Sequence, residues 1–126
     1  MSHFSYIQTQ YQNLFYLKKA LNNLNISYLQ NNSFDSKQGL SKNSLIIPQS
    51  NGSNIYFCWN GNEYDLVSDF SFWIQAASYT TFLQNISKEY ATTIITNEGQ
   101  KIGFQPIQYQ TNHDGSRTIT LERLIS

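Results

Sequence analysis

The fold is decided by the stretch 55–67, which reads Ile-Tyr-Phe-Cys-Trp-Asn-Gly-Asn-Glu-Tyr-Asp-Leu-Val. Apolar residues alternate on both sides of Asn60-Gly61, as expected of two strands that share one buried face. Asn-Gly is a strong signal for a two-residue type I′ turn, because both central residues of that turn need positive φ. We therefore predict a β-hairpin with apolar residues opposite each other. The turn would pair Phe57 with Tyr64 and Ile55 with Leu66.

A strand, a helix and a second strand are predicted before this hairpin. The run 1–9 alternates as a strand does, and no targeting signal precedes it, so we expect a protein that works where it is made. Asn13 suits the N-cap of a helix over about 14–24, whose leucines recur at spacings of three and four residues. Asn25 tolerates the left-handed conformation that ends helices, and 26–29 then reads as a strand.

The stretch 31–52 is predicted to be a flexible excursion. It mixes Ser, Asn, Gly and Pro with one short apolar run, 45–47, which Pro48 would end. We expect at most one short strand within it.

A long second helix is predicted over about 79–102, after an aromatic segment at 70–74. Ser78 suits its N-cap, and Gly103 is a typical C-terminal stop. The β-branched run 92–96 would read as a strand by itself, but helical spacing of apolar residues continues through it.

The segment 104–121 is predicted to be a closing hairpin. A three-residue loop over 113–115, with Gly115 in the left-handed conformation, brings the apolar faces of its two strands together. A two-residue turn would place these faces on opposite sides. The three-residue loop pairs Tyr109 with Ile119 and Ile107 with Leu121.

These elements predict an α+β fold in a single domain over residues 1–126. Its length lies within the usual range for one domain with one core. We expect a largely antiparallel β-sheet with the two helices, about 14–24 and 79–102, packed on one face.

Charge and composition exclude several classes of function. Eight Lys and Arg balance eight Asp and Glu, and the basic residues are scattered, so we expect no nucleic-acid binding. The longest apolar stretches span a few residues, far short of a transmembrane segment, so we expect a soluble protein.

Cys58 is the only cysteine, which excludes an intrachain disulfide and a thiolate zinc site, and we expect a buried thiol. The chain has 14 Asn and 12 Gln against 4 Ala, which indicates an AT-biased gene such as those of organelles.

Four segments resemble one known family in order and spacing. They are Met1-Ser2-His3-Phe4, the helix segment 17–21, the segment 62–70 and the turn 112–116. The chain resembles the hypothetical chloroplast open-reading-frame family of red algal plastids and cyanobacteria, a domain of unknown function. The resemblance implies a plastid-encoded protein, and it brings no catalytic residue and no cofactor.

Candidate chemistry is sparse. The carboxylates Glu63, Asp65 and Asp69 would alternate along one strand, and solvent exposure is the simplest reading of the first two. Asp69 stands beside an aromatic segment where the strand ends, so it either caps local backbone or contacts a ligand. His3 and His113 lack partners at metal-ligand spacing, so we expect no metal site. No phosphate loop, serine elbow or paired-cysteine motif is present.

Two functional hypotheses remain open. The first is a noncatalytic binding or assembly module in the plastid stroma that recognises a protein partner, because nineteen aromatic residues accompany few ionisable groups. Its predicted binding residues are Asp69, Phe72 and Trp73, and we expect no catalytic residue. The alternative is a small enzyme with a pocket around Asp69 and the segment 70–74.

Overall fold

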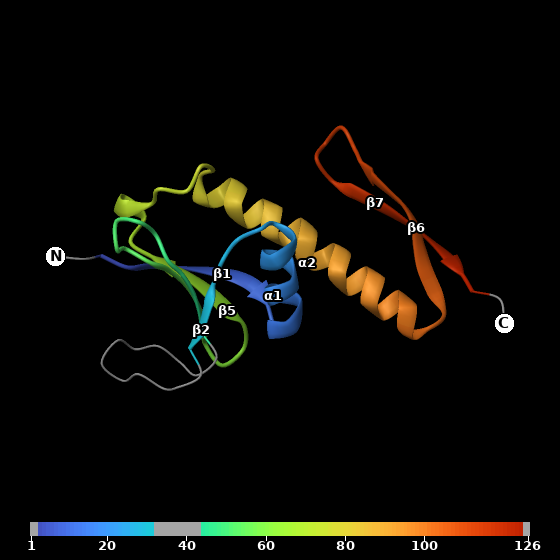
Figure 1. Ribbon diagram of the computed structural model, residues 1–126, viewed down its shortest axis with the longest axis horizontal. Coiled ribbons are helices and arrows are strands. Elements are labelled where there is room, and N and C mark those ends of the chain that lie inside the picture. The colour runs from blue at the N-terminus through green and yellow to red at the C-terminus, as the bar shows by residue number, and fades with distance from the viewer. Residues whose placement is uncertain (1–2, 32–43, 125–126) are drawn as a thin grey trace.

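The computed structural model describes residues 3–31 and 44–124, and Figure 1 shows how their elements are arranged. The order along the chain is β1 (Ser5–Tyr11), α1 (Leu14–Asn23), β2 (Leu29–Asn31), β3 (Ser44–Ile47), β4 (Ile55–Trp59), β5 (Tyr64–Ser68), a 3-10 turn η1 (Phe70–Phe72), α2 (Tyr79–Lys101), β6 (Phe104–Thr111) and β7 (Arg117–Arg123).

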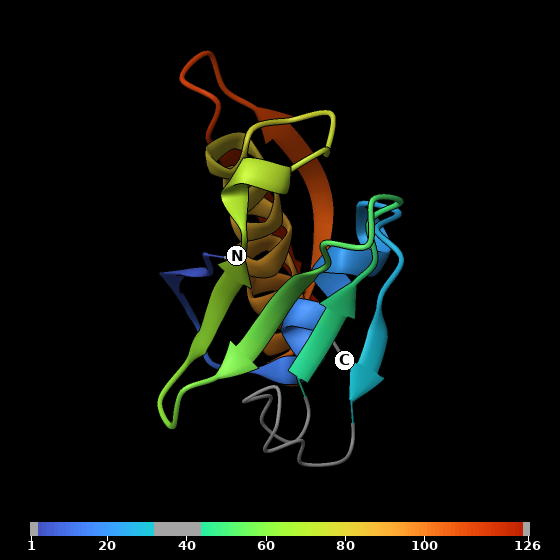
Figure 2. The same ribbon diagram turned by 90° about the vertical axis from the view of Figure 1, so that its left-hand side faces the viewer.

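Five of the strands form an antiparallel sheet in the order β1-β5-β4-β3-β2. Both helices lie behind one face of this sheet, while its other face is open to the viewer in Figure 2. The remaining strands form a separate two-stranded sheet, β6-β7, on the far side of α2 (Figure 1). The predicted α+β class is confirmed, with the difference that the closing hairpin does not join the main sheet.

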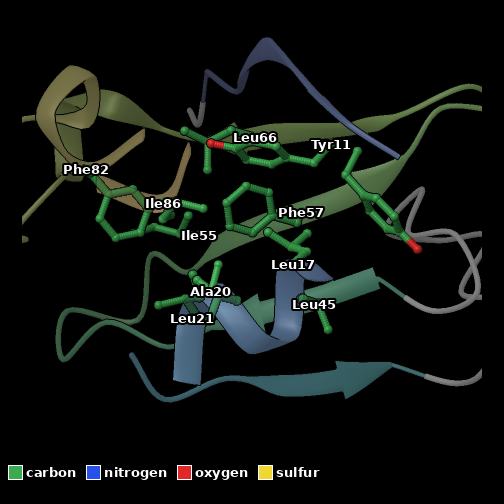
Figure 3. Close-up of a cluster of buried hydrophobic side chains, with 12 residues drawn as sticks. Tyr11, Leu17, Ala20, Leu21, Leu45, Ile55, Phe57, Leu66, Phe82 and Ile86 are labelled. Carbon is green, nitrogen blue, oxygen red and sulfur yellow. The ribbon is translucent and has the colours of Figure 1, made fainter. Parts of the chain in front are cut away.

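The core lies between the sheet and the two helices. Phe57 is fully buried in the central strand β4, with Leu66 and Leu45 paired to it from the two neighbouring strands. From the helices, Leu17, Leu21 and Ile86 reach the same layer, and all three are fully buried (Figure 3). The helix stripes predicted from apolar spacing therefore pack on the predicted face of the hairpin.

The predicted helix ends are confirmed. The side-chain oxygen of Asn13 accepts a hydrogen bond from Tyr16 N at 3.1 Å, and that of Ser78 accepts one from Thr81 N at 3.3 Å. Asn25 and Gly103 adopt positive φ after α1 and α2. The β-branched run 92–96 is helical, as predicted, and lies in the second half of α2, whose first half packs on the core through Phe82, Leu83, Ile86 and Tyr90.

The register predicted for the first hairpin is wrong by two residues. Its strands pair Trp59 with Tyr64 and Phe57 with Leu66. The loop is longer because the Asn60 side chain accepts hydrogen bonds from Asn62 N at 2.8 Å and Glu63 N at 2.9 Å. This Asx-type turn competes with the type I′ turn that Asn-Gly would otherwise favour. A slip of two residues keeps every side chain on its predicted face, so the buried set is unchanged.

Three strands differ from their predicted limits. The first strand spans Ser5–Tyr11 rather than 1–9, and Met1 and Ser2 lie outside the described residues. The second strand is β2 at Leu29–Asn31 rather than 26–29. In the predicted excursion, β3 is a buried interior strand of the sheet, and the stretch 32–43 lies outside the described residues. β3 takes this position because Leu45 and Ile47 complete the core beside β4.

The closing hairpin has the predicted loop. Gly115 adopts a φ of +87°, and Tyr109 pairs with Ile119. The predicted pairing of Ile107 with Leu121 is wrong, because a bulge at Ile107 brings Pro106 opposite Leu121. Proline cannot donate a ladder hydrogen bond, and bulges accommodate such positions.

We expect Phe57→Ala to lower the free energy of unfolding by about 3–5 kcal/mol, since it removes a large side chain from the centre of the core. Phe72→Ala is the matched control: its ring is 51% exposed, and we expect a loss below about 1 kcal/mol. Urea unfolding followed by tyrosine and tryptophan fluorescence measures both. Equal losses would contradict the central role of Phe57.

Candidate functional site

Asp69 is a structural residue in this fold. It follows β5 and is 3% exposed. One carboxylate oxygen accepts a hydrogen bond from Ser71 N at 3.1 Å, and the other accepts one from His3 N at 3.3 Å. The side chain thus caps η1 and holds the chain before β1 against the end of β5.

Trp73 and Phe72, the other two predicted binding residues, have different environments. The Trp73 ring packs on Phe70 and Phe82, and its Nε1 donates a hydrogen bond to Ala77 O at 2.8 Å. Its indole therefore has its polar group satisfied and its ring against the core. Phe72 instead turns an exposed ring outward. Phe72 and Trp73 are neighbours in the sequence, but Phe72 is exposed to solvent whereas Trp73 is partly buried.

A buried glutamine, Gln49, holds the aromatic segment in place. Its Oε1 accepts hydrogen bonds from Ile74 N at 3.0 Å and Gln75 Nε2 at 3.1 Å. Its Nε2 donates to Phe72 O at 3.1 Å and to Ser53 O at 2.6 Å. Both ends of the amide are thus used, which makes Gln49 a clamp between the loop after β3 and the segment after η1. No motif in the sequence marks this residue, because its partners in the aromatic segment, Phe72, Ile74 and Gln75, lie more than twenty positions away.

The other candidate groups lie apart from one another. Asp65 accepts a hydrogen bond from Asn60 Nδ2 at 3.0 Å. Glu63 lies in the loop before β5 and is buried, so the solvent exposure predicted for it is wrong and the predicted carboxylate row is not formed. His113 is exposed and lies in the hairpin loop predicted over 113–115. Within the described ranges, no three His, Cys, Asp or Glu side chains come close enough to hold a metal ion. No helix there combines the length and apolarity needed to cross a membrane.

Cys58 is half-buried on the open face of the sheet rather than in the core. Burial raises the pKa of its thiol to about 11, and the neighbouring Asp65 carboxylate adds to this rise in pKa. A thiol with such a pKa is almost entirely protonated at neutral pH, so it is a poor nucleophile and a poor metal ligand.

A cleft between the two helices offers polar contacts but no acid–base pair. It has a volume of about 330 Å³. Its walls carry Phe15 and Lys19 from α1, Thr96 and Asn97 from α2, and Tyr109 from β6, along with further amide and hydroxyl groups. None of the residues that line it is a carboxylate or a histidine.

A row of apolar side chains lies on the open face of the sheet. One residue from each strand contributes to a continuous row, because the strand registers place them directly opposite each other. We call it the open-face row: Tyr6, Val67, Tyr56, Ile46 and Leu29. Neighbouring strands are about 4.8 Å apart, so the row is about 19 Å long.

The ends of the open-face row are exposed. Tyr6 is 71% exposed and Leu29 61%, while Val67, next to Tyr6 in the row, is buried. Phe4, also half exposed, packs edge-on against Tyr56 with ring centroids 6.5 Å apart. Sequence reasoning missed this surface. The available signal was that β4 and β5 carry apolar residues at both odd and even positions.

Comparison with known proteins decides the family. A model of the DUF1257 family, described as a protein of unknown function, matches residues 20–120. The chain belongs to this family. The resemblance seen in the sequence is therefore confirmed.

Similar proteins are found in algae. An uncharacterized protein ycf35 from Trieres chinensis is 51% identical over 121 residues, which cover 94% of each chain. Those from Guillardia theta and Pyropia yezoensis are each 38% identical over 125 residues, or 98% of each chain. These relatives are ycf35 proteins of algal plastids, in agreement with the predicted plastid origin of this DUF1257 member. No solved structure matches the chain.

We expect Gln49→Leu to cost about 3 kcal/mol of unfolding free energy, because it leaves Ile74 N and Ser53 O without the partners they have now. Gln108→Leu makes the same chemical change on an exposed strand, and we expect a change within about 0.5 kcal/mol. Urea unfolding and hydrogen exchange at the Ile74 amide measure the effect. Unchanged exchange at that amide would rule out the clamp.

We expect Cys58 in the folded chain to react about tenfold more slowly with a disulfide reagent at pH 8 than in the urea-unfolded chain. Its pKa rises from 9.0 to about 11, which reduces the thiolate about 100-fold, and the higher nucleophilicity of the more basic thiolate recovers part of that factor. The folded-state rate should climb between pH 9 and 11. Asp65→Asn should raise the rate at pH 8, and a rate plateau reached by pH 9 would contradict the raised pKa.

Proposed function

We propose that the chain is a noncatalytic protein-binding or assembly module of the plastid stroma, which docks a folded protein partner on the open face of its sheet. The observation that carries this proposal is the open-face row, with one apolar residue from every strand and exposed rings at the β1 end. Exposed apolar side chains that gather on one face, as Phe4, Tyr6 and Leu29 do here, are typical of interaction sites.

The chemistry of this face specifies the partner. The open-face row contains no charged residue, and the adjoining row across β1, β5 and β4 consists of Gln8, Asp65 and Cys58. Tyrosine and phenylalanine rings bury much area for little lost conformational entropy, which is why they are enriched in binding surfaces. A complementary partner would therefore present an apolar patch with a rim donor for Asp65.

Phe72 extends the proposal to the segment nominated by the sequence. Asp69, Trp73 and Gln49 support the backbone of this segment through hydrogen bonds, so the Phe72 ring is held exposed on an ordered turn. We propose that Asp69 and Trp73 position this contact and that Phe72 makes it.

The alternative enzyme has no observation in its favour. Both oxygens of Asp69 accept backbone hydrogen bonds, and the side chain is buried. The cleft between the helices is lined by amides, hydroxyls, aromatic rings and one lysine, which can bind a ligand but lack a base for proton transfer.

The proposal is tested with the double variant Tyr6→Lys/Leu29→Lys as bait in an algal plastid lysate. Both side chains are largely exposed, so we expect the double variant to fold. The open-face row then carries two charges that are costly to remove from water when a partner binds. The double variant should recover at least about tenfold less of any protein that the native chain retains. A tenfold loss of affinity corresponds to about 1.4 kcal/mol, and burying an unpaired charge costs more than that. Quantitative mass spectrometry measures the retained proteins.

The control is Tyr109→Lys/Ile107→Lys, which makes equivalent changes at half-exposed positions of β6, outside the main sheet. We expect it to retain the same proteins as the native chain. Equal recovery by all three baits, or no protein retained above bare resin, would contradict docking on the open face.

A further inference from the structure

One side of β1 has no strand partner among the described residues. β1 lies at the edge of the five-stranded sheet and pairs only with β5. Its outward backbone N–H and C=O groups thus form a row that another extended chain can satisfy.

The other strand edges carry features that discourage such pairing, and β1 does not. β2, at the opposite edge, has only three residues. β6 contains Pro106 and a bulge, and β7 carries Arg117, Glu122 and Arg123. Short length, proline, bulges and charges are the usual protections of an edge. β1 has no proline and no charged residue, and its irregularity begins only after Gln8, so Ser5–Gln8 is a regular, unprotected edge.

A groove runs beside this edge, on the side that faces the helices. Its volume is about 690 Å³. Ile7 forms one wall, because it pairs with the fully buried Leu66 and so lies on the inner face of the sheet. Tyr79 and Leu83 of α2 form the floor, and the hairpin tip at 114–116 forms the far wall. We call this space the β1 groove.

Hydrogen bonds hold the walls of the β1 groove in place. The Tyr11 hydroxyl donates a hydrogen bond to Leu83 O at 3.1 Å, which joins β1 to α2. Arg117 joins the hairpin to α2 through Glu89 Oε1 at 3.0 Å and Thr92 Oγ1 at 2.9 Å. At the tip, Asp114 accepts hydrogen bonds from both the backbone and the hydroxyl of Ser116. The groove therefore exists before any ligand arrives.

We propose that β1 accepts an extended segment of a partner protein as a sixth strand of the sheet, with the inward side chains of that segment in the β1 groove. The free backbone edge recognises an extended main chain, and the groove lies where the inward side chains of the next strand would fall. Outward side chains of the added strand would continue the open-face row beyond Tyr6. The inference rests on the proposed function, because it specifies how a protein partner engages the same sheet.

The groove specifies the side chains of the segment. Ile7, Tyr79 and Leu83 offer apolar contacts, and Lys88, Asp114 and Ser116 offer polar ones at the hairpin side. A strand with alternating apolar residues, and with polar groups where it meets the hairpin side, fits this lining. A second copy of the chain fits it poorly, since the regular part of its own β1 would offer only Ser5 and Ile7 as inward side chains.

The test uses the full chain and a phage-displayed library of random peptides of about twelve residues, long enough to span the edge. We expect enriched peptides to show apolar alternation and to slow hydrogen exchange at the β1 amides of Ser5–Gln8. Gln84→Trp places a large ring in the groove from an exposed helix position and should weaken these peptides at least about tenfold, about 1.4 kcal/mol. Ala91→Trp makes a comparable change at another exposed position of α2 and should leave binding unchanged.

Ile7→Lys is a second variant, since an inward charge is a natural protection of sheet edges. Circular dichroism checks its folding, and we again expect at least about tenfold weaker peptide binding. The inference is overturned if no peptide is enriched, if bound peptides leave the β1 amides unprotected, or if Gln84→Trp binds them as well as the native chain does. Concentration-dependent protection of β1 without peptide would instead assign the edge to a second copy and overturn it too. The two proposals can fail separately. If any of these results is obtained but Tyr6→Lys/Leu29→Lys still loses its lysate partners, the proposed function holds and only the added strand is overturned.

Discussion

The structure depends on the burial of one face of the central strand. Phe57 lies in β4, with two strands on either side, and its ring is enclosed by both helices and by Tyr11 at a centroid distance of 6.2 Å. A side chain of this size can be excluded from water only if the helices pack on that face of the sheet. Because both helices of the described residues pack there, neither of them covers the opposite face, which carries the open-face row (Figure 2).

Polar and aromatic residues that resemble ligand-binding groups are mostly engaged in holding the layers together. The Tyr90 hydroxyl accepts hydrogen bonds from the backbone N–H groups of Gln12 and Asn13, which ties the turn before α1 to α2. Gln49 and Asp69 perform the same task at the other end of the sheet. Buried amides and carboxylates are stable only where hydrogen bonds replace those lost to water. The hydrogen bonds of these residues therefore serve the fold rather than a ligand.

Among the described residues, a surface and a strand edge are left without a partner. Apolar rings on the open face, an unprotected strand and a preformed groove occur around the same strand, β1. The separate hairpin contributes to this arrangement, because its salt bridge to Glu89 holds its tip beside the first half of α2. A protein built in this way is suited to holding another chain, which agrees with the protein-binding role proposed for this DUF1257 member.

The sequence alone determined the helices, their caps, the buried faces of the strands and the loop at Gly115. Each of these follows from periodicity or from a residue acting within about four positions of itself. The interior position of β3 and the clamp at Gln49 were decided only by tertiary structure, whereas the exact pairing of Phe57 was decided by a local turn that the apolar alternation does not show. Two registers of the first hairpin bury the same residues, so the pattern could not separate them, and the Asn60 side chain selected one. The free edge of β1 likewise depends on which strands pair although they lie far apart in the sequence. The local sequence of a strand does not determine its neighbours in the sheet.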